Sequence, residues 1–180
     1  MANSNGPGSQ DPKLEVANEG ELLPQVDVPS LADATVQFIG KQVSLAHNDR
    51  DIMGTFVGAE TLLGKEYLVV CNTLSNTREF LPVDAVKCLN VQDVTDYDFS
   101  GFLDRSEEIQ PLISERSFKF TIPVSTSSRA SGTLSEFGRV DKLVDIDGKA
   151  FVVLTPSSDS EATLTLLHVD EILTVKELEL

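Results

Sequence analysis

The sequence contains no tryptophan, few aromatic residues and no long apolar run. Its longest aliphatic stretches, such as YLVVC at 67–71, are far shorter than the roughly 20 residues that a membrane-spanning helix needs. The first 21 residues lack the apolar segment that is typical of a signal peptide. We therefore expect a soluble protein that is cytoplasmic or, if the source is viral, part of a virion.

Residues that commonly carry chemistry are also scarce. Cys71 and Cys88 both stand in apolar runs, which favours buried free thiols over a disulfide, and two cysteines alone cannot form a zinc site. His47 and His168 have no nucleophile in a recognisable setting beside them, so we expect ordinary surface histidines. No phosphate loop, dinucleotide fingerprint or metal-spaced set of histidines and cysteines occurs. The sequence thus predicts no enzyme, no metal and no cofactor.

The chain has few positively charged residues. Lysine and arginine together number 14 against 29 acidic residues, which gives a net charge of -15 and a pI near 4.3. Such a field repels phosphate backbones and makes direct nucleic-acid binding unfavourable. It instead favours protein partners with a basic surface.

The folded part is expected to begin near residue 30. Residues 1–29 are rich in polar residues, glycine and proline, and we interpret them as a disordered tail. The stretch 30–43 predicts one short helix, because Ser30 suits the N-cap, Asp33 the third helical position and Gly40 the C-terminal stop.

The rest of the chain contains an internal repeat of two similar units. The motif L-x-V-D-x-[VI] occurs first with Leu81, Val83, Asp84 and Val86, and again with Leu167, Val169, Asp170 and Ile172. Other matches pair Gly64-Lys65 with Gly148-Lys149, Gly54-Thr55-Phe56 with Gly132-Thr133-Leu134, and Val43 and Leu45 with Ile122 and Val124. The agreement in order and spacing favours an internal duplication over independently similar strands.

Each copy holds about five strand-length runs of alternating or continuous apolar residues. A glycine in the second strand permits the sharp bend of a small barrel, and Asp147-Gly148 suits a tight hairpin. We predict an all-β protein of two tandem small barrels, with the first at 30–92, an acidic bridge at 93–117 and the second at 118–180. Independent barrels and one merged β structure are both compatible with the sequence.

A short helix, then IGKQVSL, a turn, GTF, an aliphatic strand and a V-D-x-V link follow one another in the first unit. This order resembles the Sm-like group of SH3-type barrels, which includes the C-terminal barrel of a bacterial ribosome-maturation factor. The resemblance implies five-stranded barrels that pair by their strand edges and that bind rather than catalyse.

The bridge combines seven acidic residues with an unusual number of apolar ones. These apolar residues either cover the open end of a barrel, through a short helix ended by Pro111, or dock a protein partner. The partner-binding candidates are Tyr97, Phe99, Phe102 and Leu103.

The preferred functional hypothesis is a non-enzymatic interaction or assembly subunit, such as a scaffold or adaptor in a larger complex. Exposed strand edges can pair with another chain, a second copy included. After a duplication, we expect open edges near 43–45 and 89–91, or at their second-unit equivalents. The alternative is an Sm-like RNA-associated or ribosome-assembly factor.

Overall fold

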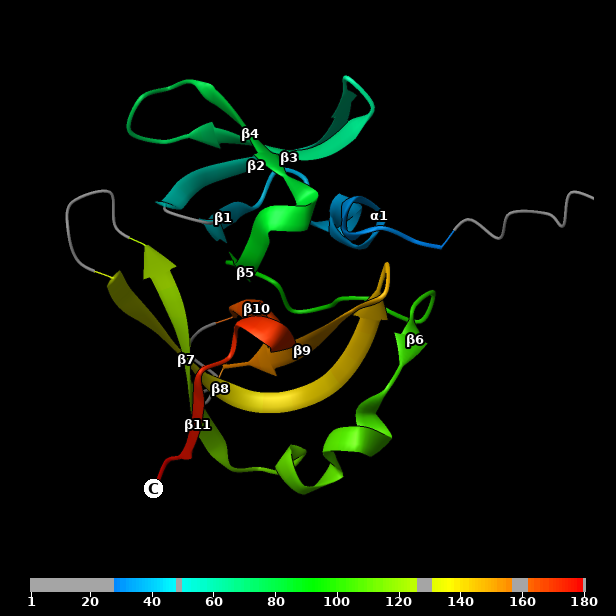
Figure 1. The fold of residues 1–180 in the computed structure, drawn as a ribbon, viewed down its shortest axis with the longest axis vertical. Coiled ribbons are helices and arrows are strands. Elements are labelled where there is room, and N and C mark those ends of the chain that lie inside the picture. Colours follow the sequence, from blue (N-terminus) through cyan, green and yellow to red (C-terminus); the bar gives the residue numbers. More distant parts are fainter. Residues whose placement is uncertain (1–27, 48–49, 126–130, 157–161, 180) are drawn as a thin grey trace, which may run out of the picture.

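The structure, a computed structural model, describes residues 28–47, 50–125, 131–156 and 162–179. Almost all of the tail expected at 1–29 lies outside these residues. The described chain is mostly β, with a short helix at its start and one large antiparallel sheet (Figure 1). This confirms the prediction that the protein is mainly β, with one short helix.

The helix forms as its capping residues predict. Helix α1 spans Leu31–Thr35 and continues as the 3₁₀ turn η1, Val36–Phe38. The Ser30 hydroxyl accepts a hydrogen bond from the Asp33 backbone N–H at 3.3 Å, and the Asp33 carboxylate accepts one from the Ser30 N–H at 2.8 Å. These two bonds satisfy amide groups that a helix N-terminus leaves without partners. Gly40 follows with a φ of +84°, a left-handed conformation that glycine adopts without strain.

Within the described residues, eleven strands make up the sheet. The first unit contains β1 (Gln42–His47), β2 (Arg50–Leu62), β3 (Lys65–Asn72), β4 (Arg78–Pro82), the 3₁₀ turn η2 (Val83–Ala85) and β5 (Val86–Val91). The bridge adds β6 (Leu103–Asp104) and the 3₁₀ segment η3 (Ser106–Leu112). The second unit contains β7 (Ser117–Ser125), β8 (Ser131–Ile146), β9 (Lys149–Thr155), β10 (Leu164–His168), η4 (Val169–Glu171) and β11 (Thr174–Glu177).

The strand order confirms that the two units have the same plan. It runs β11-β7-β8-β9-β10-β5-β1-β2-β3-β4, so each unit has its fifth strand beside its first and its fourth strand at the far side. The two 3₁₀ turns, η2 and η4, fall on the two copies of the L-x-V-D-x-[VI] motif. The pairings among the described strands do not close the sheet into a barrel.

The structure corrects part of the sequence alignment of the two units. Leu63-Gly64 and Asp147-Gly148 form equivalent turns with positive φ, and each is followed by a strand that starts with lysine. Counted back from these turns, the equivalent of Gly54 is Gly138 and not Gly132. Each lies ten residues before the turn glycine and three residues before the bulged residue of its strand, Val57 or Asp141.

The same register places Phe118 and Phe120 opposite Gly138 and Glu136, as Val43 and Leu45 lie opposite Gly54 and Ile52. Ile122 and Val124 are therefore not the counterparts of Val43 and Leu45.

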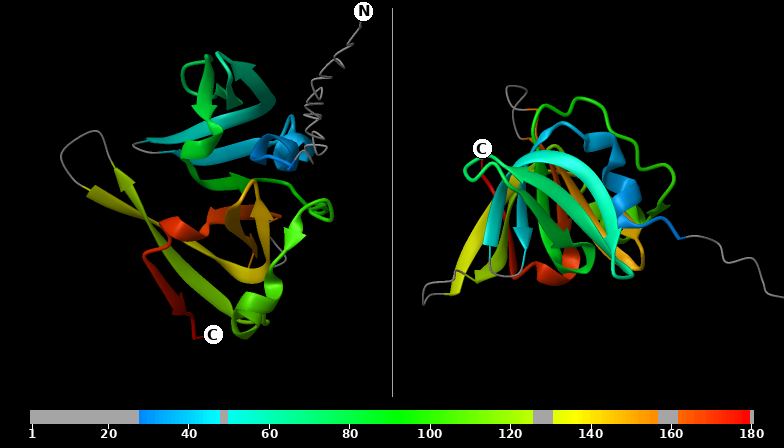
Figure 2. Two further views of the ribbon diagram at one scale, coloured as in Figure 1. Left: turned by 45° about the vertical axis from the view of Figure 1, so that its right-hand side comes forward. Right: turned by 90° about the horizontal axis from the view of Figure 1, so that it is seen from above.

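The two units share a core. Strand β5 of the first unit pairs with β10 of the second, so one sheet runs through both halves (Figures 1 and 2). One buried cluster combines first-unit side chains such as Phe38 and Leu89 with Phe151, Leu164 and Leu166 of the second unit. A second cluster is built mainly around Phe118, Phe120 and Leu154, with Cys88 from the first unit. Folding of either half therefore buries apolar surface of the other.

The bridge lies along both halves of the molecule (Figure 1). Val94, Tyr97 and Phe102 pack against the first cluster, and Ile109, Leu112 and Ile113 pack against the second. Pro111 lies inside η3 and does not end it, since the segment continues to Leu112.

Candidate functional site

The strand order of the described sheet ends in β4 and β11, each with a neighbour on one side only, and the two-residue β6 lies off this order beside β8. Strands β1 and β5, where open edges were expected, each have neighbours on both sides, so that expectation is wrong for the first unit. In the second unit it holds for β11, the equivalent of β5, and is wrong for β7, which has neighbours on both sides. The open edge at β4 was not predicted.

The edge at β4 carries two charged side chains followed by an aromatic one. Phe80 is 38% exposed, and the Arg78 guanidinium lies 5.7 Å from the centroid of its ring. Arg78 also forms an ion pair with Glu60, and Glu79 accepts a hydrogen bond from the Asn72 side chain at 2.6 Å. These contacts hold the side chains of β4 in place without covering its outer edge.

The edge at β11 is exposed along its whole length. Val175 is 44% exposed, and Lys176 and Glu177 follow it at the surface. The Glu177 carboxylate pairs with the Arg116 guanidinium at 2.8 Å, with both side chains largely in solvent. Surface pairs of this kind contribute little to stability and leave their charges available.

Strands β10 and β5, which are the counterparts of β4 and β11 in the other unit, pair with each other and are buried. Leu166 lies opposite Leu89, and Leu164 opposite Val91, with all four side chains buried. Between these pairs the Thr165 hydroxyl donates a 2.5 Å hydrogen bond to the side-chain oxygen of Asn90. An apolar strip with one polar pair in its middle thus joins the units.

A polar cluster continues from Asn90 into the second unit. The Asn90 side-chain amide donates a hydrogen bond to the Glu136 carboxylate at 3.0 Å, and the Cys88 sulfur lies 4.0 Å from the Asn90 side-chain oxygen. Burial raises the pKa of the Glu136 carboxyl, with a smaller contribution from the charge of Asp51, while its hydrogen bonds oppose the shift. Burial also raises the pKa of the Cys88 thiol. A thiol held in its protonated form is a poor nucleophile, so this cluster is suited to joining the units.

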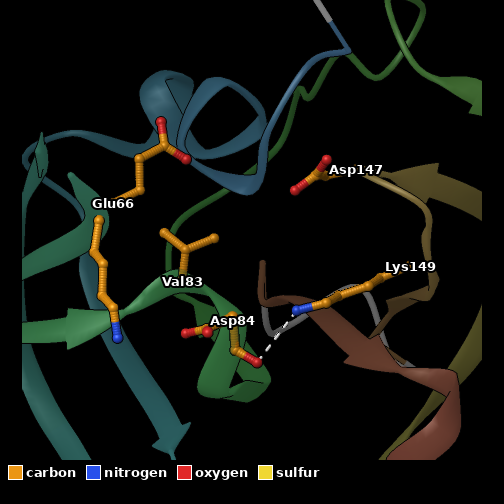
Figure 3. Close-up of a pocket in the computed structure, with 6 residues that line it drawn as sticks. Glu66, Val83, Asp84, Asp147 and Lys149 are labelled. Atoms are coloured by element: carbon orange, nitrogen blue, oxygen red, sulfur yellow. Dashed lines mark hydrogen bonds between the residues drawn. The ribbon is translucent and has the colours of Figure 1, made fainter.

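A small pocket of about 200 Å³ lies where the units meet, and Figure 3 shows its lining. Lys149 after the β8–β9 turn donates a hydrogen bond to the backbone oxygen of Asp84 in η2 at 3.2 Å. Lys65, Glu66, Val83 and Asp147 complete the lining. The lysine therefore ties the hairpin of one unit to the 3₁₀ turn of the other.

The four partner-binding candidates of the bridge separate into two kinds. Phe99 is 4% exposed and belongs to the first core cluster, with Tyr97 and Phe102 half-buried against it. The Tyr97 hydroxyl donates to Asp141 at 2.8 Å, and burial, together with this bond, raises the pKa of the phenol. Leu103 is 66% exposed. The burial of Phe99 favours the covering interpretation for that residue, and only Leu103 offers most of its surface to a partner.

Both histidines are only partly exposed. The His168 side chain is 13% exposed and stacks near Phe151, so the prediction of a surface histidine is wrong there. Burial lowers the pKa of its imidazole, with the Lys149 charge adding to this effect and those of Asp170 and Glu171 opposing it. Cys71 and Cys88 are both free, as predicted, but only Cys88 is buried and Cys71 is partly exposed.

Among the described residues, no three histidine, cysteine or acidic side chains come together as metal ligands would. Within the same residues, no helix has the length and apolar character to cross a membrane. Comparison with protein-family models, with curated proteins and with solved structures gave no match.

Sequence reasoning missed Phe80 and covered Val175 and Lys176 only as unnamed equivalents of 89–91, although the repeat contains a signal for these edge residues. The fourth strand reads REFLP in the first unit and LTLLH in the second, while the fifth reads VKCLNV and then TVKE. The more apolar strands, β10 and β5, pair with each other inside the sheet. The more charged strands, β4 and β11, lie at the two ends of the sheet.

Proposed function

We propose that this protein is a non-enzymatic interaction or assembly subunit that pairs with other protein chains through the edges of its sheet. One observation carries the proposal: strands β4 and β11 are open, whereas their counterparts β10 and β5 are paired and buried. An open edge presents backbone N–H and C=O groups to which an extended strand can bind.

Within this proposal, each unit is a small barrel of the SH3 or Sm-like type. The shared strand order supports it, as do the long second strands of 13 and 16 residues, each with a glycine and a bulge that let it curve. Figure 1 shows the strong curvature of β8. Because the units share a core, we expect limited proteolysis to release no stable fragment of a single unit.

The charge of the chain bears on its partners. A net charge of -15 favours capture of proteins with a basic surface, through long-range attraction that salt weakens. The acidic bridge with the exposed Leu103 is the surface that combines charge and apolar area for such a contact.

The test is purification of the tagged full chain from its native source, beside a matched variant that carries both Phe80→Glu and Val175→Glu. We expect the wild type to retain a protein partner in stoichiometric amount, a second copy included, and the edge variant to lose it. A wild type that is monomeric at submillimolar concentration and retains no protein would overturn the proposal. Retention of RNA in a salt-sensitive manner would instead support the RNA-associated alternative.

A further inference from the structure

The internal pairing of β5 with β10 provides a template for what the open edges bind. In that pairing Leu167 lies opposite Cys88, Leu166 opposite Leu89, Thr165 opposite Asn90 and Leu164 opposite Val91. Because the chain is a duplication, β4 is the counterpart of β10, and β11 is the counterpart of β5. The unit-to-unit contact can therefore be formed once more, by β4 of one molecule and β11 of another.

The repeat fixes the register of such a contact. Leu81 corresponds to Leu167, since both precede the V-D element and both lie opposite equivalent residues of the third strand, Leu68 and Val152. Thr174 and Val175 correspond to Cys88 and Leu89, since Val175 lies opposite Phe120 as Leu89 lies opposite Leu45.

We infer that the partner of the two edges is a second copy of this chain, with β4 of one copy paired antiparallel to β11 of the next. This rests on the proposed function and names the partner. The transferred register places Phe80 opposite Val175, Glu79 opposite Lys176 and Arg78 opposite Glu177.

The residues that meet in this register are complementary. Phe80 and Val175 are both partly exposed apolar side chains and occupy the places of Leu166 and Leu89. Glu79 and Lys176 take the places of Thr165 and Asn90, so an ion pair replaces the internal hydrogen bond. Opposite charges directly across antiparallel strands stabilise their pairing, and like charges destabilise it.

The charges of Arg78 and Glu177 also oppose each other in this register. Both residues already have partners within the chain, Glu60 and Arg116, on exposed surface. Such pairs are weak in solvent and can exchange or extend into a network across the junction.

The contact in Figure 3 transfers in the same way. Inside the chain, Lys149 of the second hairpin binds the backbone oxygen of Asp84. In the repeat, Lys65 is the counterpart of Lys149 and Asp170 is the counterpart of Asp84, and both are exposed. Pairing of β4 with β11 between two copies therefore brings Lys65 of one copy to the 3₁₀ turn η4 of the other.

The contact is heterologous, because each copy uses a different edge at each end. Strands β4 and β11 lie toward opposite ends of the molecule in Figure 1, so both can be engaged at once. Repetition of such a contact gives a closed ring or an open filament, depending on the rotation between copies.

Charges on edge strands also serve to prevent pairing, and this is the competing explanation. The two explanations differ in what a change of sign does. If the charges only block the edges, Glu79→Lys and Lys176→Glu should leave a monomer unchanged. If they select a copy of the chain, each change should weaken an existing contact.

Sedimentation velocity of the full chain tests this from micromolar to submillimolar concentration, at physiological salt, where screening acts beyond about 8 Å. We expect wild type to self-associate, and Glu79→Lys or Lys176→Glu alone to raise the dissociation constant about tenfold or more. An equimolar mixture of the two variants should regain wild-type association, because every junction again joins a lysine to a glutamate. The doubly substituted chain should do the same.

The control is Glu107→Lys on the exposed part of the bridge, which changes the net charge as Glu79→Lys does. By reducing the overall negative charge, both changes favour self-association, so only loss of a local pair explains weakening by Glu79→Lys. Because Glu79 accepts a hydrogen bond from Asn72, the melting temperature of the Glu79→Lys variant is measured in parallel. Lys176→Glu, on the exposed strand β11, provides a second, independent variant.

A wild-type chain that stays monomeric throughout, or single variants that associate as wild type does, would overturn this inference. Hydrogen exchange adds a readout of place, because protection should rise with concentration at β4 and β11 and not at β6. The proposed function fails separately: it survives a monomeric chain that binds a different protein through Phe80 and Val175, and it falls if no edge-dependent complex of any kind forms.

Discussion

Thr165 and Asn90 lie opposite each other across β10 and β5, and the threonine hydroxyl donates a hydrogen bond of 2.5 Å to the asparagine oxygen. The side-chain NH₂ group of Asn90 donates a hydrogen bond to the Glu136 carboxylate at 3.0 Å. One side chain thereby connects three strands from both halves of the chain.

Asn90→Ala is expected to lower the free energy of unfolding by about 1–3 kcal/mol, because it leaves Thr165 and Glu136 without this partner in a buried position. Urea denaturation followed by circular dichroism measures the change. Gln110→Ala, at an exposed position of η3, is the control and should change stability by less than about 0.5 kcal/mol. Equal effects of the two substitutions would contradict the assigned role.

Glu136→Gln is expected to raise the melting temperature at neutral pH. The pKa of this carboxyl is raised in the folded state, mainly by burial, so its ionised form costs stability above that pKa and the cost disappears as pH falls through it. The difference between variant and wild type should therefore shrink on acidification. Melting curves across a pH series measure it, with Glu107→Gln as an exposed control; a difference that grows toward low pH would reverse the sign and contradict the assignment.

Phe99→Ala is expected to cost about 3 kcal/mol or more in stability, because it removes a buried aromatic ring from the shared core. The half-buried Phe102 should cost less when truncated. Leu103→Ala should leave the melting temperature nearly unchanged, since this side chain is 66% exposed. If the bridge docks a partner, Leu103→Ala loses the complex while the fold persists, and a large loss of stability in this variant would exclude that role.

Gly54→Ala and Gly138→Ala are both expected to destabilise the protein, because a Cβ would lie 2.1 Å from the backbone oxygen of Cys71 in one case and 2.5 Å from that of Thr155 in the other. Thermal melting measures the loss. Gly101→Ala is the matched control, with nothing within 4 Å of its Cβ position. Because the two sites are equivalent in the repeat, an effect at only one of them would contradict the corrected alignment.

Local features of the fold could be predicted from the sequence because neighbouring residues determine them. Ser30 and Asp33 form the cap of α1, Asp147-Gly148 forms a hairpin turn, and both L-x-V-D-x-[VI] motifs form 3₁₀ turns. Each depends on hydrogen bonds and backbone conformations within a few residues.

The register of the repeat could not be predicted in the same way. In the stretch FKFTIPV, Phe118, Phe120, Ile122 and Val124 alternate with other residues, so a period of two fits any of them to Val43 and Leu45. Tertiary pairing decides among these choices. The open edges were likewise hidden, because the order of strands depends on the contact of β5 with β10 across most of the chain.

The shared core has a consequence for synthesis of the chain. Leu164 and Leu166 complete the apolar cluster around Leu89, and a ribosome adds them long after β5. Until then β5 of the nascent first half is paired with β1 alone, and its other edge, with Leu89 and Val91, is a surface prone to aggregation. The duplicated halves therefore complete their shared core together, and slow translation of β10 prolongs the exposure of the β5 edge.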